Sequence, residues 1–347
     1  MITIENLTKY YGKNRAVNNI SFTINDNEIL GFLGPNGAGK STTMNMIAGY
    51  LPMTSGKVTI FGHDITRDAT NAKLELGYLP EIPPVYPDMK VTEYLSFCAG
   101  IKRIPRGKRK DEINRVMELL KITDVKGKLI RNLSKGYRQR VGFAQALLGD
   151  PKFIILDEPT VGLDPNQVVE VRKLIKSLKK DHTVIFSSHI LSEVSEVCDR
   201  VVIINKGDIR AIDTIENLES TFSDSLSLHI KIKGSKSKAA SIIETTEGVK
   251  EILSIDDEGN DIYSFVVQLS GDAEEIQDKL MADLLGSQIR IVEIFTEKPN
   301  LENVFIDLIN RPVKKERLED LLNEIVPETD SADDGAEDDE DEEKEDI

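Results

Sequence analysis

A short glycine-rich stretch, GFLGPNGAGKST, carries the residue types that bind phosphate groups. Glycines at this spacing let backbone N–H groups point inward around a phosphate, and the start of the helix that follows adds partial positive charge. Lys40 then reaches the β- and γ-phosphates, and the Ser41 hydroxyl supplies a ligand for Mg²⁺. The sequence therefore predicts a phosphate-binding loop made of Gly34, Pro35, Asn36, Gly37, Ala38, Gly39, Lys40, Ser41 and Thr42.

Two adjacent acids form the second chemical feature. In FIILDEP, four apolar residues predict a buried strand whose end delivers Asp157 and Glu158. Carboxylates in that position are costly unless they are paired or lie near a cation. Asp157 is placed to hold Mg²⁺, mostly through water, and Glu158 to act as the general base that polarises an attacking water. For this pair alone, an acidic strand-to-loop turn without chemistry is the alternative.

The elements that position these residues alternate between short β-branched runs and segments of helical period through the first 215 residues. This alternation predicts an α/β fold, a P-loop NTPase core with a largely parallel, buried sheet. Residues 84–150 lack a strand signal, and apolar residues recur there at helical spacing: Ile113, Val116, Met117 and Leu120. We expect a helical lobe inserted into a first domain that spans residues 1–220.

The pattern changes near residue 224, where the runs begin to read β-α-β-β-α-β. This order predicts a small ferredoxin-like α+β domain over residues 224–312, closed by a helix in NLENVFIDLINR. Residues 327–347 hold thirteen acids and one lysine, and so contribute −12 to the net charge of −16. Such a segment has little apolar surface to bury, so we expect an acidic disordered tail over residues 313–347. Its role is either to solubilise the chain or to dock on a partner.

The bulk composition of the 347 residues is that of a globular protein, with 39% hydrophobic and 30% charged residues. The chain has neither an apolar run that could span a membrane nor a secretion signal, which favours the cytosol. Cys98 and Cys198 are too few for a disulfide framework or a zinc cluster, and both are expected to be buried thiols. Outside the acidic tail there is no basic excess, so nucleic acid is not expected as a partner.

A third stretch, RNLSKGYRQR, precedes a helix and contains Leu133, Ser134, Lys135, Gly136 and Tyr137. With the phosphate loop, LDEP and LSKG in this order, the first 215 residues resemble the ATPase subunits of ABC transporters. In that family the signature grips the γ-phosphate of ATP held by a second, head-to-tail ATPase domain. The resemblance implies that Ser134 and Gly136 serve a partner's nucleotide and that the chain works as a homodimer. Lys135 and Tyr137 replace the glycine and glutamine that the family often has.

The resemblance extends to three further positions. Tyr11, in KYYGK, matches the aromatic residue that stacks on adenine, with Tyr10 as a neighbouring candidate. Asp164, in VGLDP, matches the loop that crosses the dimer interface. His189, in FSSHIL, matches the switch histidine that contacts the γ-phosphate and orients Glu158 and the water. The implied catalytic residues are Glu158, His189 and Lys40. The remaining histidines match no motif and are expected at the surface: His63, His182 and His229.

Glu81, in LGYLPEIPP, departs from the family pattern because glutamine is common at this position. A carboxylate binds Mg²⁺ more strongly than an amide carbonyl, but it adds negative charge near the γ-phosphate. We expect Glu81 to ligate Mg²⁺ together with Ser41 and Asp157, and to couple the site to the membrane partner.

Basic residues cluster in IKRIPRGKRK, where six of the nine positions from Lys102 to Lys110 are lysine or arginine. One interpretation is a solvated turn between helices. The other is a surface that faces anionic lipid or a loop of a membrane domain, where each charge contributes about 1 kcal/mol.

Together these features predict the ATP-hydrolysing, energy-coupling subunit of an ABC transporter that uses ATP and Mg²⁺. We expect a separate integral membrane permease as its partner, and attachment through that permease to the cytoplasmic, inner face of the cell membrane. The sequences of these motifs resemble those in ATPase subunits of exporters of the drug, polysaccharide or gliding-motility kind. The alternatives are a soluble ABC ATPase that acts on ribosomes or nucleic acid, and an ATP-binding regulator without turnover.

Overall fold

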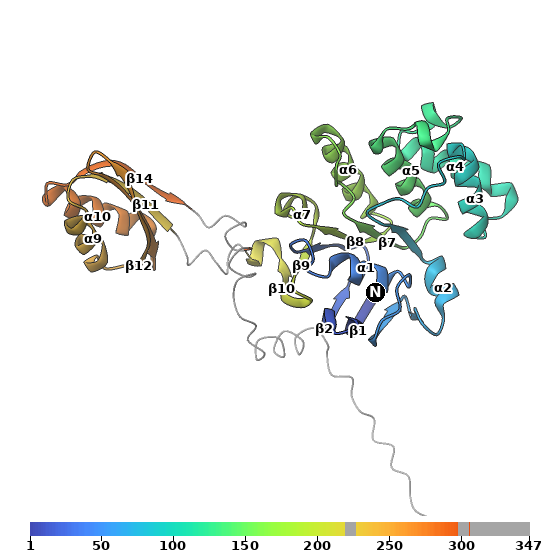
Figure 1. Ribbon diagram of the computed structural model, residues 1–347, viewed down its shortest axis with the longest axis horizontal. Helices are drawn as coiled ribbons and strands as arrows, with labels where there is room; N and C mark the ends of the chain where they lie inside the picture. Colours follow the sequence, from blue (N-terminus) through green and yellow to red (C-terminus); the bar gives the residue numbers. More distant parts are fainter. Residues whose placement is uncertain (219–226, 298–304, 306–347) are drawn as a thin grey trace, which may run out of the picture. The chain divides into compact units, whose positions relative to one another are not determined.

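The computed structural model describes residues 1–218, 227–297 and Phe305 (Figure 1). Its strands are β1 (Ile2–Tyr11), β2 (Asn14–Ile24), β3 (Ile29–Leu33), β4 (Ser55–Ile60), β5 (His63–Asp64), β6 (Leu76–Leu79), β7 (Phe153–Asp157), β8 (Thr183–Ser188), β9 (Arg200–Asn205), β10 (Asp208–Thr214), β11 (Ser227–Lys233), β12 (Val249–Gly259), β13 (Ile262–Leu269) and β14 (Arg290–Glu297). Its α-helices are α1 (Lys40–Ile47), α2 (Ala69–Leu74), α3 (Val91–Ile101), α4 (Arg106–Leu119), α5 (Lys135–Leu147), α6 (Pro165–Leu178), α7 (Leu191–Val197), α9 (Lys236–Thr245) and α10 (Ala273–Gly286). Two short 3₁₀ turns lie between α4 and α5, at Thr123–Val125 and Ile130–Asn132.

The central sheet has the strand order β10-β9-β3-β8-β7-β6. The strands from β9 to β6 are parallel to their neighbours, and β10 is antiparallel to β9. Both faces of this sheet are buried, because successive side chains of a strand point to opposite faces. Ile154 and Leu156 of β7 belong to one core cluster, whereas Phe153 and Ile155 belong to the other. The predicted parallel, buried sheet is therefore confirmed.

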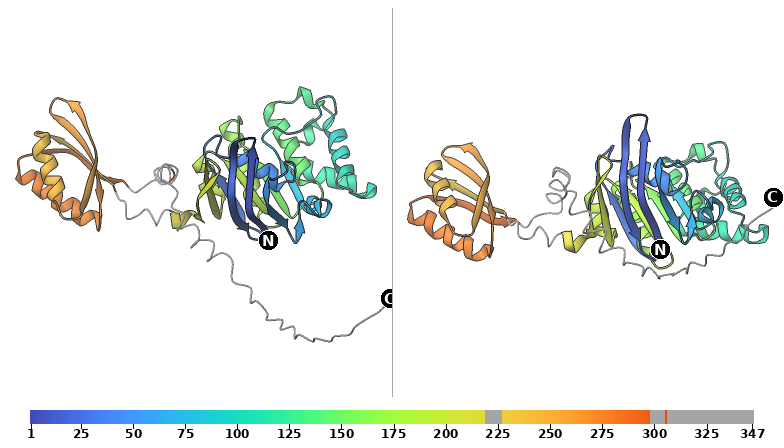
Figure 2. Two further views of the ribbon diagram at one scale, coloured as in Figure 1. Left: turned by 60° about the horizontal axis from the view of Figure 1, so that its bottom comes forward. Right: turned by 90° about the horizontal axis from the view of Figure 1, so that it is seen from below.

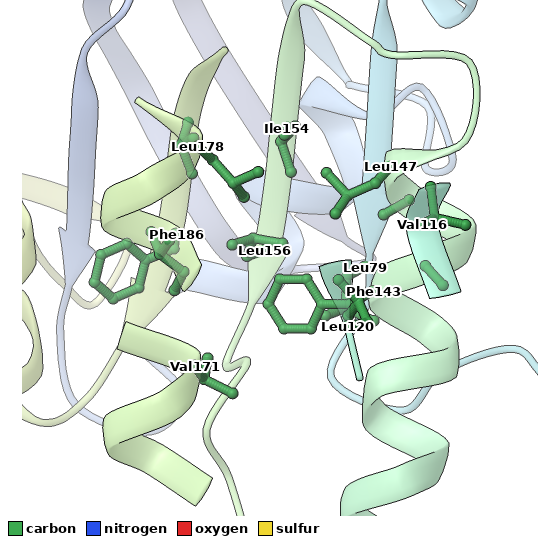
Figure 3. Close-up of a cluster of buried hydrophobic side chains, with 14 of the residues drawn as sticks. Leu79, Val116, Leu120, Phe143, Leu147, Ile154, Leu156, Val171, Leu178 and Phe186 are labelled. Carbon is green, nitrogen blue, oxygen red and sulfur yellow. The ribbon is translucent and has the colours of Figure 1, made fainter. Parts of the chain in front are cut away.

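Helices α5 and α6 cover one face of β7, as Figure 3 shows. On this face, Phe143 and Leu147 of α5 lie along one flank of the strand, and Val171 of α6 lies along the other flank. On the opposite face, α1 contacts β7, β8 and also β2. The helices thereby fix the ends of the strands from which the candidate chemical groups emerge.

A second sheet, with the order β2-β1-β4-β5, is antiparallel and was not predicted from the sequence. Its strands interrupt the period-two pattern that normally reveals such a sheet. Register shifts occur along β1 and β2, and Asn6 and Asn19 have φ angles of 50° and 47°. Bulges of this kind move residues to the other face and so obscure the alternation of apolar and polar residues.

Between β6 and β7 the described chain forms α3, α4 and α5 and no strand, although a single bridge joins Lys90 to Leu129. The apolar residues predicted to share one helix face are all buried: Ile113, Val116, Met117 and Leu120. Among the described residues, no helix has the length and apolar character needed to cross a membrane.

The C-terminal part has the order β11-α9-β12-β13-α10-β14, which agrees with the predicted pattern. Its antiparallel sheet has the strand order β12-β13-β11-β14, and both helices lie on one face (Figure 2). Ile230 and Phe265 of the sheet belong to one buried cluster with Leu280 of α10. The predicted closing helix, residues 300–311, lies outside the described residues except for Phe305, which packs against the first core cluster. The predicted acidic tail also lies outside them.

Candidate active site

Four neighbouring strands of the central sheet end at one edge, because they run parallel. Gly34 follows β3, and Glu81 lies two residues after the end of β6. β7 ends at Asp157, and β8 ends at Ser188, directly before His189. The sheet therefore gathers at one edge residues that lie far apart in the sequence.

Two glycines of the loop after β3 occupy positions that a residue with a side chain would not tolerate, one because of close packing and one because of its backbone conformation. A Cβ atom on Gly34 would lie 2.3 Å from the carbonyl oxygen of Ile204. Gly39 has a φ of 108°, a conformation that L-residues rarely adopt. Lys40 is only 5% exposed, and its Nζ donates hydrogen bonds to the carbonyl oxygens of Gly34 at 2.8 Å and Pro35 at 3.2 Å. The loop thus holds its lysine in place at the start of α1.

Asp157 lies buried at the end of β7 and accepts two hydroxyl hydrogen bonds. Its Oδ1 is 3.2 Å from Ser41 Oγ and 2.6 Å from Ser187 Oγ. Burial raises the pKa of the Asp157 carboxyl, and the negative charges of Glu158 and Glu81 add to the rise, while both hydroxyl groups oppose it. A cation at this position would relieve the repulsion among the carboxylates.

The donor set around Asp157 suits Mg²⁺, which prefers oxygen ligands. Among the described residues, no group of three His, Cys, Asp or Glu side chains is arranged to hold a metal ion. Mg²⁺ usually keeps several waters and takes one or two carboxylates plus phosphate oxygens of the substrate. A site with Ser41 and Asp157 as protein ligands fits that requirement, and Glu81 lines one pocket together with Ser41.

Glu158 lies between a lysine and a histidine. Its Oε1 is 3.2 Å from Lys40 Nζ, and its Oε2 is 2.9 Å from His189 Nδ1. Its backbone N–H donates to Ser187 Oγ at 2.9 Å, and its φ of 48° falls in the left-handed region, which costs free energy for a residue with a Cβ. The surrounding structure therefore holds the Glu158 backbone in a strained conformation, and contacts on both oxygens orient the carboxylate.

Lys40, Ser41, Glu81, Glu158 and His189 line a pocket of about 420 Å³, whereas Asp157 is not among its lining residues. Its lining comprises Ala16, Asn36, Gly37, Gly39, Lys40, Ser41, Thr42, Glu81, Glu158, Val161 and His189. All four strand ends thus contribute to one cavity, with a lysine, two carboxylates and a histidine facing it. Ala16 and Val161 were not predicted, because isolated apolar residues carry no chemical signal. Ser187 was also missed, since its contact with Asp157 depends on the pairing of β7 with β8.

Of the predicted nucleotide contacts, Gly34, Pro35 and Ala38 of the phosphate loop are not among the lining residues, and neither are three contacts from later in the chain. Ser134 is exposed and caps α5, where its Oγ accepts a backbone N–H of the first turn. Gly136 is buried beneath Gln167, whose Oε1 would lie 2.6 Å from an added Cβ. Asp164 caps α6 by accepting the N–H of Gln167 at 3.0 Å. None of the three is among the lining residues of the pocket.

Tyr11 also lies outside the lining, at the end of β1. Its side chain is 49% exposed, and Lys9 Nζ lies 5.3 Å from the ring centroid. Tyr10 is exposed to a similar degree. Either ring is therefore available for stacking on a flat ligand.

One expectation about the histidines was wrong. His182 is buried, with 6% exposure, and its Nδ1 lies 2.7 Å from the carbonyl oxygen of Pro151. A histidine that satisfies a buried carbonyl leaves no pattern in the local sequence. His63 and His229 are partly exposed, and Cys198 is partly rather than fully buried.

Two residues of the basic cluster serve the fold. Lys102 donates to the carbonyl oxygen of Leu76, and burial lowers its pKa to about 8. Arg109 donates from Nε to the carbonyl oxygen of Ile104 at 2.8 Å. The remaining four basic residues are exposed: Arg103, Arg106, Lys108 and Lys110. These four are the most accessible members of the cluster for an anionic surface.

Comparison with known proteins gives matches along most of the chain. The family described as "ABC transporter" matches residues 17–161. The linearmycin resistance ATP-binding protein LnrL of Bacillus subtilis is 32% identical over 318 residues, which cover 90% of this chain and 100% of that protein. The bacitracin transport ATP-binding protein BcrA of Bacillus licheniformis is 32% identical over 311 residues, covering 89% and 97%.

Solved structures match the same fold. The ATP-binding subunit of an ABC transporter matches with a TM-score of 0.59 and 25% identity, covering 64% of this chain and 93% of that one. The cbiO1 protein of Clostridium perfringens, part of an ABC transporter complex, matches with a TM-score of 0.56 and 26% identity, covering 64% and 94%.

Proposed function

The chain belongs to the ATP-binding subunits of ABC transporters and hydrolyses ATP, and from this premise we propose that two copies enclose ATP head to tail. One observation carries the proposal: the pocket built by Lys40, Glu158 and His189 includes neither Ser134 nor Gly136 of the same chain. Ser134 is exposed at the start of a helix, where it can reach a ligand held by another molecule. A homodimer supplies each pocket with the second chain's signature.

Within each pocket we assign the roles from the contacts. Lys40 and the loop N–H groups hold the β- and γ-phosphates of ATP. Glu158 accepts a proton from the attacking water, and His189, at 2.9 Å from the Glu158 carboxylate, keeps that carboxylate oriented. Ser41, Asp157 and Glu81 would hold Mg²⁺, which would neutralise charge on the phosphates when bound. Tyr11 stacks on adenine, and Asp164 crosses to the second copy.

The dimer drives a separate integral membrane permease, and the chain attaches to the cytoplasmic face of the cell membrane through it. We propose that the transporter is an exporter, since LnrL is described by linearmycin resistance and BcrA by bacitracin transport. Both relatives match over nearly their whole length, and the 90% and 89% of this chain that they cover must include part of the region after residue 224.

The boundary between the two proposed domains lies where the central α/β sheet ends, after β10, and the β-α-β-β-α-β pattern begins, at β11. We assign residues 1–220 to the ATPase domain, with a helical lobe at about 84–150, and residues 224–312 to an accessory domain. The strand order β12-β13-β11-β14, with two helices on one face, supports a ferredoxin-like assignment for that domain.

The head-to-tail arrangement is testable by mixing inactive chains. Ser134→Ala lacks the signature hydroxyl, whereas Lys40→Ala lacks the lysine of the phosphate loop. In a mixed dimer, the loop of the first chain and the signature of the second chain form one intact site. With random pairing at equal amounts, about half of the dimers are mixed, and each mixed dimer has one intact site of its two. We therefore expect about one quarter of the wild-type ATP turnover per chain.

A matched control mixes Lys40→Ala with Glu158→Gln. Both lesions then affect the pocket of the chain that carries them, so no dimer has an intact site and turnover stays low. The proposal fails if Ser134→Ala alone hydrolyses ATP at the wild-type rate, or if both mixtures behave alike.

A further inference from the structure

A buried carboxylate on α7 joins the two loops that carry the proposed catalytic groups. Glu193 is only 2% exposed, and its Oε2 accepts hydrogen bonds from Thr160 Oγ1 and Ser188 Oγ, each at 2.8 Å. Thr160 lies two residues after Glu158, and Ser188 directly precedes His189. We propose that Glu193 is a positioning residue for ATP hydrolysis, which sets the distance between Glu158 and His189.

The serine contact restrains the backbone around His189. Ser188 Oγ donates to Glu193 and also accepts the N–H of Ile190 at 3.0 Å. The carbonyl oxygen of Ser188 accepts the N–H of Gly34 at 3.3 Å. Both peptide groups that flank His189 are thereby tied, one to the side chain of Ser188 and one to the start of the phosphate loop. These contacts restrain the backbone from which the His189 side chain projects into the pocket.

The threonine contact restrains the turn that follows Glu158. In this turn the N–H of Val161 donates to the carbonyl oxygen of Glu158, and the N–H of Leu163 donates to that of Thr160, both at 3.2 Å. Anchoring the Thr160 side chain to Glu193 therefore anchors the whole turn. Glu158 needs such support, because its positive φ is unfavourable for a glutamate.

Two connections consequently join the β7 and β8 loops. Ser187 Oγ contacts Asp157 and the backbone N–H of Glu158. Ser188 faces the other way, since neighbouring residues of a strand alternate, and reaches Thr160 through Glu193. The 2.9 Å contact between His189 and Glu158 joins the same two loops. A carboxylate at position 193 is suited to this role because one oxygen can accept both hydroxyl groups.

The inference rests on the proposed roles of Glu158 and His189, and the variants of Glu193 separate positioning from simple packing. Glu193→Ala should lower kcat for ATP about 10- to 100-fold while KM changes less than about threefold, since a small misplacement of reacting groups is costly, whereas Lys40 and the loop N–H groups make no hydrogen bond to Glu193. Glu193→Gln should recover much of the lost kcat, because its carbonyl oxygen can still accept both hydroxyl groups. Glu193→Met fills the same space without an acceptor and should stay as slow as the alanine variant. Recovery by Met but not by Gln would overturn the inference.

The decisive measurement combines Glu193→Ala with His189→Ala in the purified full-length protein, under single-turnover conditions. Because Glu193 also anchors the turn after Glu158, the loss caused by Glu193→Ala should be smaller in the His189→Ala background than in the wild-type chain, though not absent. A loss of the same factor in both backgrounds would show that Glu193 does not act on the spacing of Glu158 and His189 and would overturn the inference. A His189→Ala protein with wild-type turnover would instead refute the proposed role of His189, so the two failures are distinguishable.

A control on the same helix is Glu196→Gln, which alters an exposed acid paired with Arg172 and should leave kcat unchanged. Should Glu193→Ala fail to fold, Thr160→Val removes one of the two contacts at nearly constant volume. Its kcat should fall with KM unchanged, and the loss should be smaller in the His189→Ala background. A loss of the same factor in both backgrounds would count against the inference.

Discussion

Replacing Glu158 by glutamine removes one negative charge and the proposed proton acceptor with almost no change in shape. Glu158 is 6% exposed, so its partners define the consequence. The amide can still contact His189, and its backbone stays tied to Ser187. Removing a general base typically costs about 10²- to 10⁴-fold in rate, which corresponds to about 3 to 5 kcal/mol in the barrier. ATP affinity should be unchanged or higher, because a negative charge beside the γ-phosphate is lost.

Glu158→Gln should also lower the free energy of unfolding of the ATP-free protein. Lys40 loses its charged partner at 3.2 Å, but it keeps the carbonyl oxygens of Gly34 and Pro35. The loss should therefore be about 1 to 3 kcal/mol. Single-turnover phosphate release, equilibrium ATP binding and urea unfolding separate these effects, with Glu196→Gln as a control. Turnover of Glu158→Gln within about threefold of wild type would refute the assignment of the base.

Three further substitutions probe the loop, the metal ligand and a buried lysine. Gly34→Ala should destabilise the fold by about 1 to 3 kcal/mol and abolish ATP binding, because its Cβ would lie 2.3 Å from the carbonyl oxygen of Ile204. Thermal unfolding and ATP titration test this prediction. Glu81→Ala should raise the Mg²⁺ concentration needed for half-maximal turnover, and an unchanged Mg²⁺ dependence would contradict its role as a ligand. Burial lowers the pKa of Lys102 in the folded chain from 10.5 to about 8. Between these two pH values Lys102 is protonated in the unfolded chain but not in the folded chain. The free energy of unfolding therefore rises with pH in this window, by about 1.4 kcal/mol per pH unit. Urea unfolding of Lys102→Met, compared at about pH 7.5 and about pH 9.5, should lack this contribution.

Contiguous motifs made much of the pocket predictable. The loop glycines, Lys40 and Ser41 follow one another along the chain, and a buried strand must deliver Asp157 and Glu158 together at its end. Their chemistry is therefore visible without knowledge of the strand order. The apolar period of the helices and of the C-terminal strands was equally local, which is why those elements were predicted.

Contacts made across elements were not predictable in this way. Glu193 lies in LSEVSEV, where it resembles any acid on a helix surface. Only the fold reveals that it is buried between Thr160 and Ser188. The antiparallel sheet of β1, β2, β4 and β5 was missed for a related reason, because its bulges break the alternation from which a strand is predicted. His182 was misplaced because its partner, a backbone carbonyl, has no sequence signature.

Ser134 can serve its own chain and a partner at once, because a hydroxyl both accepts and donates. Its Oγ accepts the N–H of Tyr137 as a helix cap, which leaves its hydrogen free to meet a phosphate oxygen of ATP bound to the other copy. Ser134→Asp keeps the capping acceptor but places a negative charge where that phosphate should bind. We expect Ser134→Asp to retain the stability that Ser134→Ala loses, about 1 kcal/mol, yet to hydrolyse ATP no faster than the alanine variant. Urea unfolding and phosphate release decide this, and wild-type turnover by Ser134→Asp would mean that no phosphate approaches this residue.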